Sequence, residues 1–581
     1  MTSFRWIFPA AAAAGADALR AELDLAPLAA RVLIRRGLSD PGAARLFLEA
    51  PLSGLHDPFL LRDMDRAVAR LERAVRSAAK IQIHGDYDVD GVTSVALLMK
   101  VFAMACATAT WRVPHRLRDG YGIRPEAVEA AAAEGVTLIV SVDTGIRAGS
   151  AVSRAAELGI DTIVTDHHLP EAAMPPAVAI LNPNRPDCSY PDKNLCGATI
   201  AFKLAQALLS RLGWSGDRLA RVSESLLRIV AIATVADVTP LTGENRIIVK
   251  RGLADLAAAR NPGLRSLLEV AGIAGGESVT ARQVAFQIAP RINAAGRMDT
   301  AERVVELFLT GDERLARAIA AELHARNAER QKIEAAIRDA CERMPVDPGA
   351  AALVYYRPDW HRGVLGIVAS RLVERRRRPV FVLGLDSESG LAQGSGRSIP
   401  AFHLLEALDS MPELFLRYGG HAHAAGVTLA PERIPEFRER LNAFAAAHLG
   451  EEDFAPQLEI DAIVDPEEIG EDAVRSLDRL APFGHGNPQP LLAALDVEVS
   501  APPVVFAQKH LRVTVKRNGR SLTLKAWNQA EDAAFFLPGA RLDIAFTVEA
   551  DPYSAARGYQ PWTASLRAAR EAGPSGLPPA F

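Results

Sequence analysis

Cysteine is scarce in this chain of 581 residues, which contains four: Cys106, Cys188, Cys196 and Cys341. They are scattered, and no two have the Cys-x-x-Cys spacing. The sequence therefore indicates neither a disulfide framework nor a thiolate zinc site. This cysteine usage fits a reducing compartment, and we expect the protein to be cytoplasmic.

The chain also lacks a strong net charge. Its formal net charge is −4 at pH 7, and 23% of its residues are charged and 49% hydrophobic, which is ordinary for a globular protein. No overall basic character indicates nucleic acid as a partner. This does not exclude nucleic acid, because a folded protein can confine its positive charge to one groove.

Neither of two apolar stretches is expected to be an export signal or a membrane span. Trp6 to Ala14 has the outline of a secretory signal, but Pro9 interrupts it and a charged helical pattern follows. Val92 to Trp111 is long enough to span a membrane, but Lys100 lies in its middle. A buried core helix is therefore expected there.

Glycine and proline are absent between Glu313 and Met344. Apolar residues recur in this stretch with helical spacing, as at Leu315, Ile319 and Leu323. The pattern predicts one helix, about 48 Å long at ~1.5 Å per residue. Such a helix would separate two domains and face a cleft between them.

What the chain does contain is a dense acidic motif, KIQIHGDYDVDGVTS, at residues 80–94. A short strand pattern ends at His84, and Asp86, Asp88 and Asp90 follow at alternate positions. Alternate positions of an extended chain point to one side, so three carboxylates would crowd one place. A divalent cation would offset their repulsion, and hard oxygen ligands suit Mg²⁺ or Mn²⁺. The alternative is an aspartate-rich turn that caps the following helix.

Two further apolar runs end in polar clusters. Residues 136–142 (VTLIVSV) lead into Asp143, and residues 161–165 (DTIVT) lead into Asp166, His167 and His168. Helical segments separate these runs, which predicts βαβ units and a parallel sheet buried on both faces. Ligands of such sheets bind outside the carboxyl ends of the strands, where all three polar clusters are expected.

These clusters form a candidate metal site, which Asp237 joins if it does not merely cap the next element. We expect two divalent ions, Mn²⁺ or Mg²⁺, because a mixture of carboxylates and imidazoles suits Mn²⁺ at least as well as Mg²⁺. Two such ions can promote an in-line displacement at phosphorus. The candidate ligands are His84, Asp86, Asp88, Asp90, Asp143, His167 and Asp237, with His168 as a ligand, a support for a ligand or a phosphate contact.

A second group of motifs suits anions. Gly394-Ser395-Gly396-Arg397-Ser398 offers flexible backbone N–H groups and an arginine fork, unless it is a plain surface turn. Residues 419–426 would let the backbone approach a ligand closely, and their His421 and His423 either contact phosphate or pack. Arg291 and Arg297 bracket a further loop of small residues.

From about residue 452 the pattern changes to short strands at 458–463, 511–516, 522–527 and 541–548, with turns such as Asn518-Gly519. This pattern predicts a small β-barrel. Basic residues surround Trp527, which would stack on the bases of a single strand above a cationic groove. A basic hairpin of this kind is also often simply solvated.

The motifs resemble those of a known family. HGDYDVDG, SVDTG, TDHH and ATVADVTP match the four motifs of the DHH phosphoesterase superfamily, and GGHAHAAG resembles its DHH-associated domain. PHRLRDGYGI (114–123), LCGATIAFKL (195–204), APRINAAGRMD (289–299), WHRGVLGIVASRL (360–372) and LAPFGHGNPQP (480–490) are similar to the RecJ family of bacterial exonucleases. The resemblance covers nearly the whole chain. Thr199 departs from it, where the family usually has a smaller residue.

The resemblance implies a single-stranded-DNA-specific 5′→3′ exonuclease that releases 5′-mononucleotides with Mn²⁺ or Mg²⁺ in DNA repair and recombination. It implies Asp88, Asp90, Asp143, His167 and Asp237 as metal ligands, with Asp86 and His84 as further members of the site. It also implies phosphate or DNA-end contacts from Arg297, Ser395, Arg397, His421 and His423, and Arg291 and Ser398 belong to the same motifs.

The predicted fold class is α/β and multidomain, with a parallel-sheet domain, a connecting helix, a second α/β domain and a C-terminal OB-fold barrel. The predicted ranges are a helical lead-in at 1–75, the DHH domain at 76–312, the connecting helix at 313–344, the DHH-associated domain at 345–450, the OB-fold at 452–572 and a disordered tail at 573–581.

Single-stranded DNA is the expected partner, and the resemblance implies a monomer that cooperates with a helicase and a single-stranded-DNA-binding protein. Other DHH proteins hydrolyse cyclic dinucleotides, short oligoribonucleotides or pyrophosphate, but these are generally shorter and lack an OB-fold. A non-catalytic strand-binding scaffold is the other alternative. All the motif carboxylates and histidines are present, which favours an enzyme.

Overall fold

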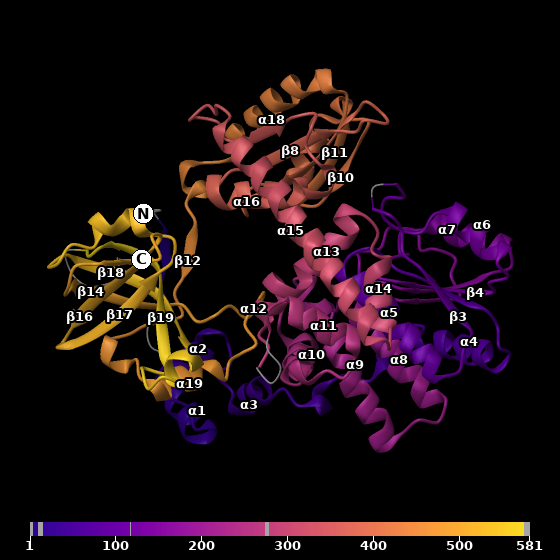
Figure 1. Ribbon diagram of the computed structural model, residues 1–581, viewed down its shortest axis with the longest axis horizontal. Coiled ribbons are helices and arrows are strands. Elements are labelled where there is room, and N and C mark those ends of the chain that lie inside the picture. The colour runs from indigo at the N-terminus through magenta and orange to yellow at the C-terminus, as the bar shows by residue number, and fades with distance from the viewer. Residues whose placement is uncertain (1–3, 10–14, 117, 274–277, 574–581) are drawn as a thin grey trace. The chain divides into compact units, whose positions relative to one another are not determined.

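The structure is a computed structural model that describes residues 4–9, 15–116, 118–273 and 278–573. It divides into two compact units, whose elements are labelled in Figure 1. The larger unit comprises Pro51–Leu449 and Gly484–Asn487, and the smaller unit comprises Met1–Ala50, Gly450–Phe483 and Pro488–Phe581. The predicted tail lies, apart from Gly573, outside the described residues.

A five-stranded parallel sheet forms the first part of the larger unit, in the order β3-β2-β4-β5-β6. Its strands are β2 (Ile81–His84), β3 (Ala109–Arg112), β4 (Leu138–Val142), β5 (Asp161–Thr165) and β6 (Ala179–Leu181). Every residue of β2 and β4 is buried. The prediction of a parallel sheet buried on both faces is confirmed.

Alternate side chains of β4 pack against helices on opposite faces of the sheet. Leu138, Val140 and Val142 share a large apolar cluster with α4, α5, α8 and α9, whereas Ile139 packs with α6 and α7. These helices are α4 (Met64–Arg76), α5 (Val89–Met104), α6 (Pro125–Ala133), α7 (Gly149–Glu157), α8 (Gly197–Arg211) and α9 (Gly216–Ala236). Among the described helices, none is both long and apolar enough to cross a membrane.

A helical subdomain completes this part of the unit. It consists of α10 (Gly243–Ala254), α11 (Pro262–Val270), α12 (Ala281–Gln283), α13 (Ala289–Met298) and α14 (Glu302–Leu309). The prediction of a loop between Arg291 and Arg297 is wrong, because both residues lie on α13. The helical run continues from α12 into α13 through a π-helical turn at Val284–Ile288, and the proline of α13 follows directly after this turn.

The long helix predicted at 313–344 is confirmed as α15 (Glu313–Arg343). Its last turns pack Ile337 and Cys341 into the core of a second sheet, whose order is β10-β11-β9-β8-β7. The elements of this region are β7 (Leu353–Tyr356), α16 (Leu365–Arg376), β8 (Val380–Leu385), β9 (Ala392–Arg397), α17 (Leu404–Asp409), β10 (Arg417–Gly420), β11 (Ala424–Leu429) and α18 (Ile434–His448).

The Gly-Ser-Gly-Arg-Ser motif is not the flexible loop that its composition suggests. Residues up to Arg397 form β9, which pairs with β8 on one side and β11 on the other. A Cβ on Gly396 would lie 2.5 Å from the ring of Phe381, and one on Gly394 would lie 2.7 Å from the side chain of Leu383. The glycines make room for these side chains. Because the backbone of β9 is paired on both sides, the polar side chains of the motif are the groups that could contact a ligand.

The smaller unit contains a closed barrel. Five of its strands pair in the cyclic order β14-β16-β17-β19-β18 and back to β14, and β17 and β19 are parallel. This is the connectivity of an OB-fold, in which the third and fifth strands close the barrel. The five strands are β14 (Leu492–Val499), β16 (His510–Arg517), β17 (Arg520–Ala526), β18 (Arg541–Ala550) and β19 (Trp562–Glu571).

Short elements complete the smaller unit. The predicted turn at Asn518-Gly519 joins β16 to β17 with positive φ at both residues, as a two-residue hairpin turn requires. The strand predicted at 458–463 is divided into two short strands. The short elements are β12 (Gln457–Glu459), β13 (Ala462–Ile463), α19 (Glu471–Asp478), β15 (Val504–Phe506) and α20 (Pro552–Ala555).

The N-terminal region differs from the single helical lead-in predicted at 1–75. It contains a strand, β1 (Arg5–Ile7), which pairs in parallel with β12. Helices α1 (Ala16–Leu23), α2 (Pro27–Arg35) and α3 (Pro41–Glu49) pack on the apolar core of the barrel, whereas α4 packs under the parallel sheet. Contacts between residues far apart in sequence decide this division, and local spacing does not reveal them.

Candidate metal and phosphate site

The predicted site residues gather at the carboxyl ends of the parallel strands. Asp86 follows β2, Asp143 follows β4, and Asp166, His167 and His168 follow β5. Asp143 has a φ of 57°, in the left-handed region that residues other than glycine seldom adopt. Such strain is characteristic of functional sites, and here it turns the chain sharply at the end of β4.

The acidic motif itself forms a tight turn into α5. Asp88 is the N-cap of this helix, and its Oδ1 accepts a hydrogen bond of 3.0 Å from the amide of Gly91. A Cβ on Gly91 would lie 2.5 Å from the carbonyl oxygen of Asp86. Both interpretations of the motif, a helix cap and a carboxylate cluster, are therefore realised in the same turn.

The first turn of α8 holds Asp90 in place. The amides of Gly197 and Ala198 donate hydrogen bonds of 2.6 and 2.7 Å to its two carboxylate oxygens. A Cβ on Gly197 would lie 2.7 Å from Cβ of Asp143. Glycine at this position thus lets α8 approach both aspartates. The sequence gives a signal for this in the motif LCGATIAFKL, to which no role was assigned.

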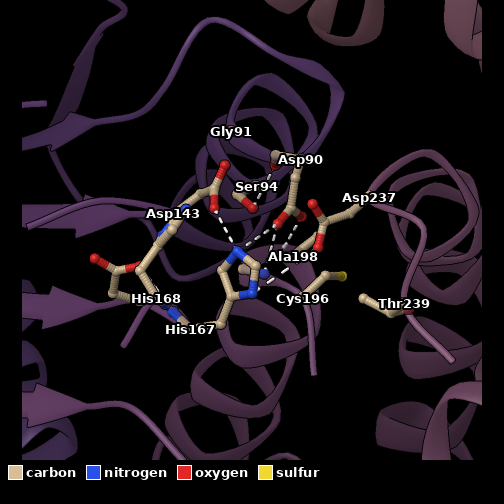
Figure 2. Close-up of polar contacts among 12 residues, drawn as sticks. Asp90, Gly91, Ser94, Asp143, His167, His168, Cys196, Ala198, Asp237 and Thr239 are labelled. Carbon is tan, nitrogen blue, oxygen red and sulfur yellow. Dashed lines mark hydrogen bonds and ion pairs between the residues drawn. The ribbon is translucent and has the colours of Figure 1, made fainter. Parts of the chain in front are cut away.

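The imidazole of His167 lies at the centre of the site (Figure 2). Its Nε2 is 3.1 Å from Oδ1 of Asp143 and 3.8 Å from Oδ2 of Asp90, and its Nδ1 is 3.8 Å from Oδ2 of Asp237. Side chains from one strand end and two helices therefore converge on the ring of His167, which itself follows β5.

Three overlapping groups of side chains could each hold a cation. Their ligand atoms lie within 4.8 Å of one another in the sets Asp143–His167–His168, Asp90–His167–Asp237 and Asp86–Asp88–Asp143. His84 belongs to none of the groups found in the described part of the chain. Its side chain is buried beside Gln82, where its Nε2 lies 2.6 Å from Oε1 of Gln82, and burial lowers the pKa of His84 to about 4.

The electrostatics of the site favour a bound cation. Burial and the neighbouring carboxylates raise the pKa of Asp143 and of Asp86 well above the usual value. Oδ1 of Asp86 is buried and accepts no hydrogen bond within the described residues, and the buried Oδ1 of Asp143 faces Nε2 of His167. Burial also lowers the pKa of His167, which keeps its imidazole neutral and available as a ligand. Carboxylates this close stay ionised only beside a positive charge, so the donor set fits a divalent cation.

Asp237 strengthens this conclusion. It is the C-cap of α9, where the unpaired carbonyl groups carry partial negative charge. Burial, with Asp90 and Asp88 nearby, raises the pKa of Asp237 to about 9. A carboxylate is therefore unfavourable at this position unless a cation lies in front of it.

Asp166 has a role that the sequence did not assign. Its buried Oδ1 lies 2.7 Å from Nδ1 of His168 and accepts a hydrogen bond of 2.8 Å from the amide of His167, while Oδ2 accepts one of 2.9 Å from the amide of Ile146. A carboxylate at Nδ1 fixes the orientation and tautomer of a histidine. The hydroxyl of Tyr121, also unassigned, lies 3.2 Å from the same Nδ1.

A cationic group lies beside the acidic motif. Burial, with the guanidinium groups of Arg116, Arg330 and Arg397 nearby, lowers the pKa of Arg297 to about 10. Asp88 is the negative charge in this surrounding. The repulsion between neighbouring guanidinium groups is offset when an anion such as phosphate binds beside them. Arg116 and Arg330 were not predicted, although Arg116 lies in the motif PHRLRDGYGI.

The other predicted anion contacts have different surroundings. Arg397 donates to Oγ of Ser395 at 2.8 Å, whereas Oγ of Ser398 donates to the carbonyl of Phe402. Nε of Arg291 donates to Nδ1 of His324 at 3.2 Å. His421 and His423 lie exposed at the turn between β10 and β11. The structure thus groups Arg397 and Ser395 with Arg297, and their roles stay predictions.

Trp527 lies on the outer surface of the barrel with 44% of its area exposed. Its ring contacts those of His510 and Phe506, with centroids 4.8 and 5.8 Å away, and Lys525 Nζ lies 6.0 Å from its centroid. An exposed aromatic cluster with cations around it is the surface predicted for stacking on bases.

Family models match three parts of the chain. Residues 80–234 match the DHH family N-terminal domain, residues 349–447 match the DHHA1 domain, and residues 460–560 match the RecJ OB domain. These segments contain the parallel sheet, the second sheet and most of the barrel.

Several curated relatives are named single-stranded-DNA-specific exonuclease RecJ. The protein of Dickeya dadantii is 40% identical over 79% of this chain and 82% of its own length, and that of Escherichia coli is 37% identical over 81% and 83%. The protein of Bacillus subtilis is 38% identical over 90% of this chain, which spans 66% of that protein's length.

Solved structures agree in fold. The structure of RecJ from Thermus thermophilus in complex with Mn²⁺ is 32% identical, covers 98% of this chain and 80% of its own, and gives a TM-score of 0.84. The corresponding complex with Mg²⁺ is 31% identical, covers 98% and 79%, and gives a TM-score of 0.78. The fold, the motifs and these relatives together show that the chain belongs to the RecJ family within the DHH superfamily.

Proposed function

We propose that this protein is a metal-dependent exonuclease that degrades single-stranded DNA in the 5′→3′ direction and releases 5′-mononucleotides. The observation that carries the proposal is the convergence of Asp90, Asp143 and Asp237 on His167, beside a group of buried and partly buried arginines. This arrangement can hold cations and a phosphodiester at adjacent positions. The RecJ names of the relatives supply the substrate class.

Two divalent ions, Mn²⁺ or Mg²⁺, would be held by Asp86, Asp88, Asp90, Asp143, His167 and Asp237, with His168 at the edge of the set. When bound, such ions supply positive charge that stabilises charge developing on the phosphoryl oxygens. The protein contributes a rigid frame. The first turn of α8 fixes Asp90, and Asp166 fixes His168.

The direction of degradation follows in this proposal from the arginines. Arg297 and Arg397, with Arg116 and Arg330 nearby, would bind the terminal phosphate of a 5′ end. The guanidinium of Arg397 donates a hydrogen bond to Oγ of Ser395, so the two side chains lie close enough to contact the same phosphate group. An arginine guanidinium can bind two oxygens of one phosphate at once. Binding of the terminal phosphate in this way would fix the position of the terminal nucleotide relative to the metal site.

The barrel would bind the strand outside the site. Base stacking on Trp527 does not depend on sequence, because every base has a π-face. We further propose that the protein is a cytoplasmic monomer that acts in DNA repair and recombination, supplied with single strands by a helicase and a single-stranded-DNA-binding protein. Only the resemblance to the family supports these last roles.

The test is hydrolysis of end-labelled DNA with Mn²⁺. Single-stranded DNA labelled at its 5′ end should release labelled mononucleotide from the earliest times, whereas label at the 3′ end should stay in long products until late. Duplex DNA without single-stranded ends should resist. His167→Ala should abolish release while the circular dichroism spectrum is retained. Early release of a 3′ label, or equal degradation of duplex, would refute the proposal.

A further inference from the structure

The acidic motif contacts α13 through the residues on either side of Asp88. The amide of Val89 donates a hydrogen bond of 3.2 Å to Oδ1 of Asn293. On the other side, a Cβ on Gly296 would lie 2.7 Å from the carbonyl oxygen of Tyr87 and 3.3 Å from its Cβ. Gly296 therefore lets α13 approach the turn closely, and Asn293 fixes the helix there.

These contacts connect a candidate metal ligand to a candidate phosphate contact. Asp88 lies between Tyr87 and Val89, and Arg297 follows Gly296 directly. Each of the two charged residues is therefore one position away from a contact between the turn and α13. Consecutive Cα atoms are about 3.8 Å apart, so these contacts limit how far the backbone of Arg297 can lie from that of Asp88.

The side chain of Arg297 is held on its other side as well. Its Nη1 donates a hydrogen bond of 3.2 Å to the carbonyl of Gly363, in the turn before α16. On the first turn of α16, a Cβ on Gly366 would lie 3.1 Å from both Oγ of Ser395 and Nη2 of Arg397. The hydrogen bonds of Arg297 and Arg397 within the described residues go to carbonyl and hydroxyl oxygens. These oxygens carry no full charge, so a phosphate can still offset both guanidinium groups.

Tyr87 also supports a further arginine. The guanidinium carbon of Arg116 lies 4.8 Å from the ring centroid of Tyr87, within the range of a cation–π contact. Arg116 is one of the cations that surround Arg297. The face of the ring makes this contact, so a phenylalanine could make it equally. Tyr87 thus joins Arg116 to the acidic turn.

The spacing of these groups matters because two phosphates of the substrate have to be placed at once. In the proposed function the end phosphate binds the arginines while the next phosphodiester lies at the metal ligands. Adjacent phosphates of a strand are joined by one sugar, which limits their separation. A larger or variable distance between the arginines and Asp88 would admit cleavage at a later phosphodiester, since small misplacements decide which bond reacts.

We propose that Tyr87 and Asn293 are positioning residues that hold the arginines and the metal ligands one nucleotide apart, and so make the mononucleotide the product. This role rests on the proposed function and deepens it, because it says what sets the length of the product. Neither residue needs to contact the substrate. Asn293 acts through α13 and Arg297, and Tyr87 acts through Arg116.

The experiment compares the wild type with Tyr87→Leu, Tyr87→Phe and Asn293→Ala on single-stranded DNA with Mn²⁺. A radioactive 5′ phosphate reports the length of the first product, and steady-state kinetics are measured on 5′-phosphorylated and 5′-hydroxyl DNA. Isothermal titration gives the Mn²⁺ affinity. Asn442→Ala is the control, because Oδ1 of Asn442 likewise accepts hydrogen bonds from backbone amides, those of Ala351 and Ala352, at 2.7 and 3.2 Å.

Tyr87→Leu and Asn293→Ala should release dinucleotides as well as mononucleotides as first products. The KM for 5′-phosphorylated DNA should rise about fivefold in each, and the KM for 5′-hydroxyl DNA should rise less. The Mn²⁺ affinity should be retained. Tyr87→Phe keeps the ring and should restore the mononucleotide as the sole first product, and Asn442→Ala should not change it.

Mononucleotide as the sole first product of both Tyr87→Leu and Asn293→Ala would overturn this proposal and leave the proposed function in place. Loss of activity by equal factors on the two substrates, with weaker Mn²⁺ binding, would overturn it too, because the two residues would then only support the metal site. Failure of the wild type to release its 5′ label as mononucleotide would overturn the proposed function itself.

Discussion

The amide of Gly197 donates a hydrogen bond of 2.6 Å to Oδ2 of Asp90, although the two residues lie on different helices. The same glycine faces Asp143, with no room for a Cβ between them. The first turn of α8 therefore fixes the distance between two of the carboxylates that face His167. Replacing Gly197 tests whether the metal site depends on this fit.

Gly197→Ala should abolish Mn²⁺ binding and nuclease activity together. The new Cβ would lie 2.7 Å from Cβ of Asp143 and 3.0 Å from Oδ2 of Asp90, so α8 or the strand end must move. Mn²⁺ binding is measured by isothermal titration and activity by mononucleotide release. Gly149→Ala is the control, since Gly149 begins α7 and its Cβ would meet no atom within 4 Å. Full metal affinity in Gly197→Ala would show that the fit is unimportant.

Asp166→Asn should weaken Mn²⁺ binding by about 10- to 100-fold, the usual effect of removing a carboxylate that orients a ligand. The amide cannot accept hydrogen bonds through both ends, so either Ile146 or the two histidines lose a partner. Titration with Mn²⁺ measures the affinity, and ¹⁵N NMR of His168 reports its tautomer. Asp161→Asn, at the other end of β5, is the control. An unchanged tautomer and affinity would contradict the positioning role.

Arg397→Gln should raise the KM for 5′-phosphorylated DNA by about tenfold or more, as expected for the loss of a charged hydrogen bond to phosphate. With 5′-hydroxyl DNA the increase should be smaller, because the terminal phosphate is absent. Steady-state kinetics on both substrates checks this. Arg417→Gln, an exposed arginine of β10, is the control. Equal effects on the two substrates would place Arg397 elsewhere than at the end phosphate.

Asp478→Asn should stabilise the protein at neutral pH. Burial at the end of α19 raises the pKa of Asp478 to about 6. A carboxyl with a raised pKa contributes stability that is present below its unfolded pKa of about 4 and is lost as the pH rises through the folded value. The melting temperature of the wild type should therefore fall below that of the variant between pH 4 and pH 7. Parallel curves for the two proteins over this pH range would contradict this.

The parallel sheet could be predicted because its signal is local. Each buried strand is a short apolar run, and each ends in the polar residues that the sheet brings together, as Asp143 does after β4. The barrel strands alternate clearly, and Asn518-Gly519 specifies its turn. Periodicity also sufficed for α15, since no residue interrupts it.

The remaining features depend on contacts that no local pattern contains. The glycines of β9 suggest a loop, but Phe381 and Leu383 occupy the space beside them. The proline and small residues of α13 also suggest a loop, but they continue a helical run that starts at α12. Asp166 looks like a ligand of the same kind as its neighbours, and only its hydrogen bonds show that it faces His168 and Ile146. His84 follows the spacing of the acidic motif but points to Gln82.

A crystal soaked with Mn²⁺ tests the central claim most directly, because anomalous diffraction locates manganese without reference to activity. Two peaks are predicted within bonding distance of the carboxylates of Asp88, Asp90, Asp143 and Asp237 and the imidazole of His167. The same soak of His167→Ala should lose at least one peak. Manganese bound only elsewhere at saturating concentration, or no peak among these residues, would contradict the account.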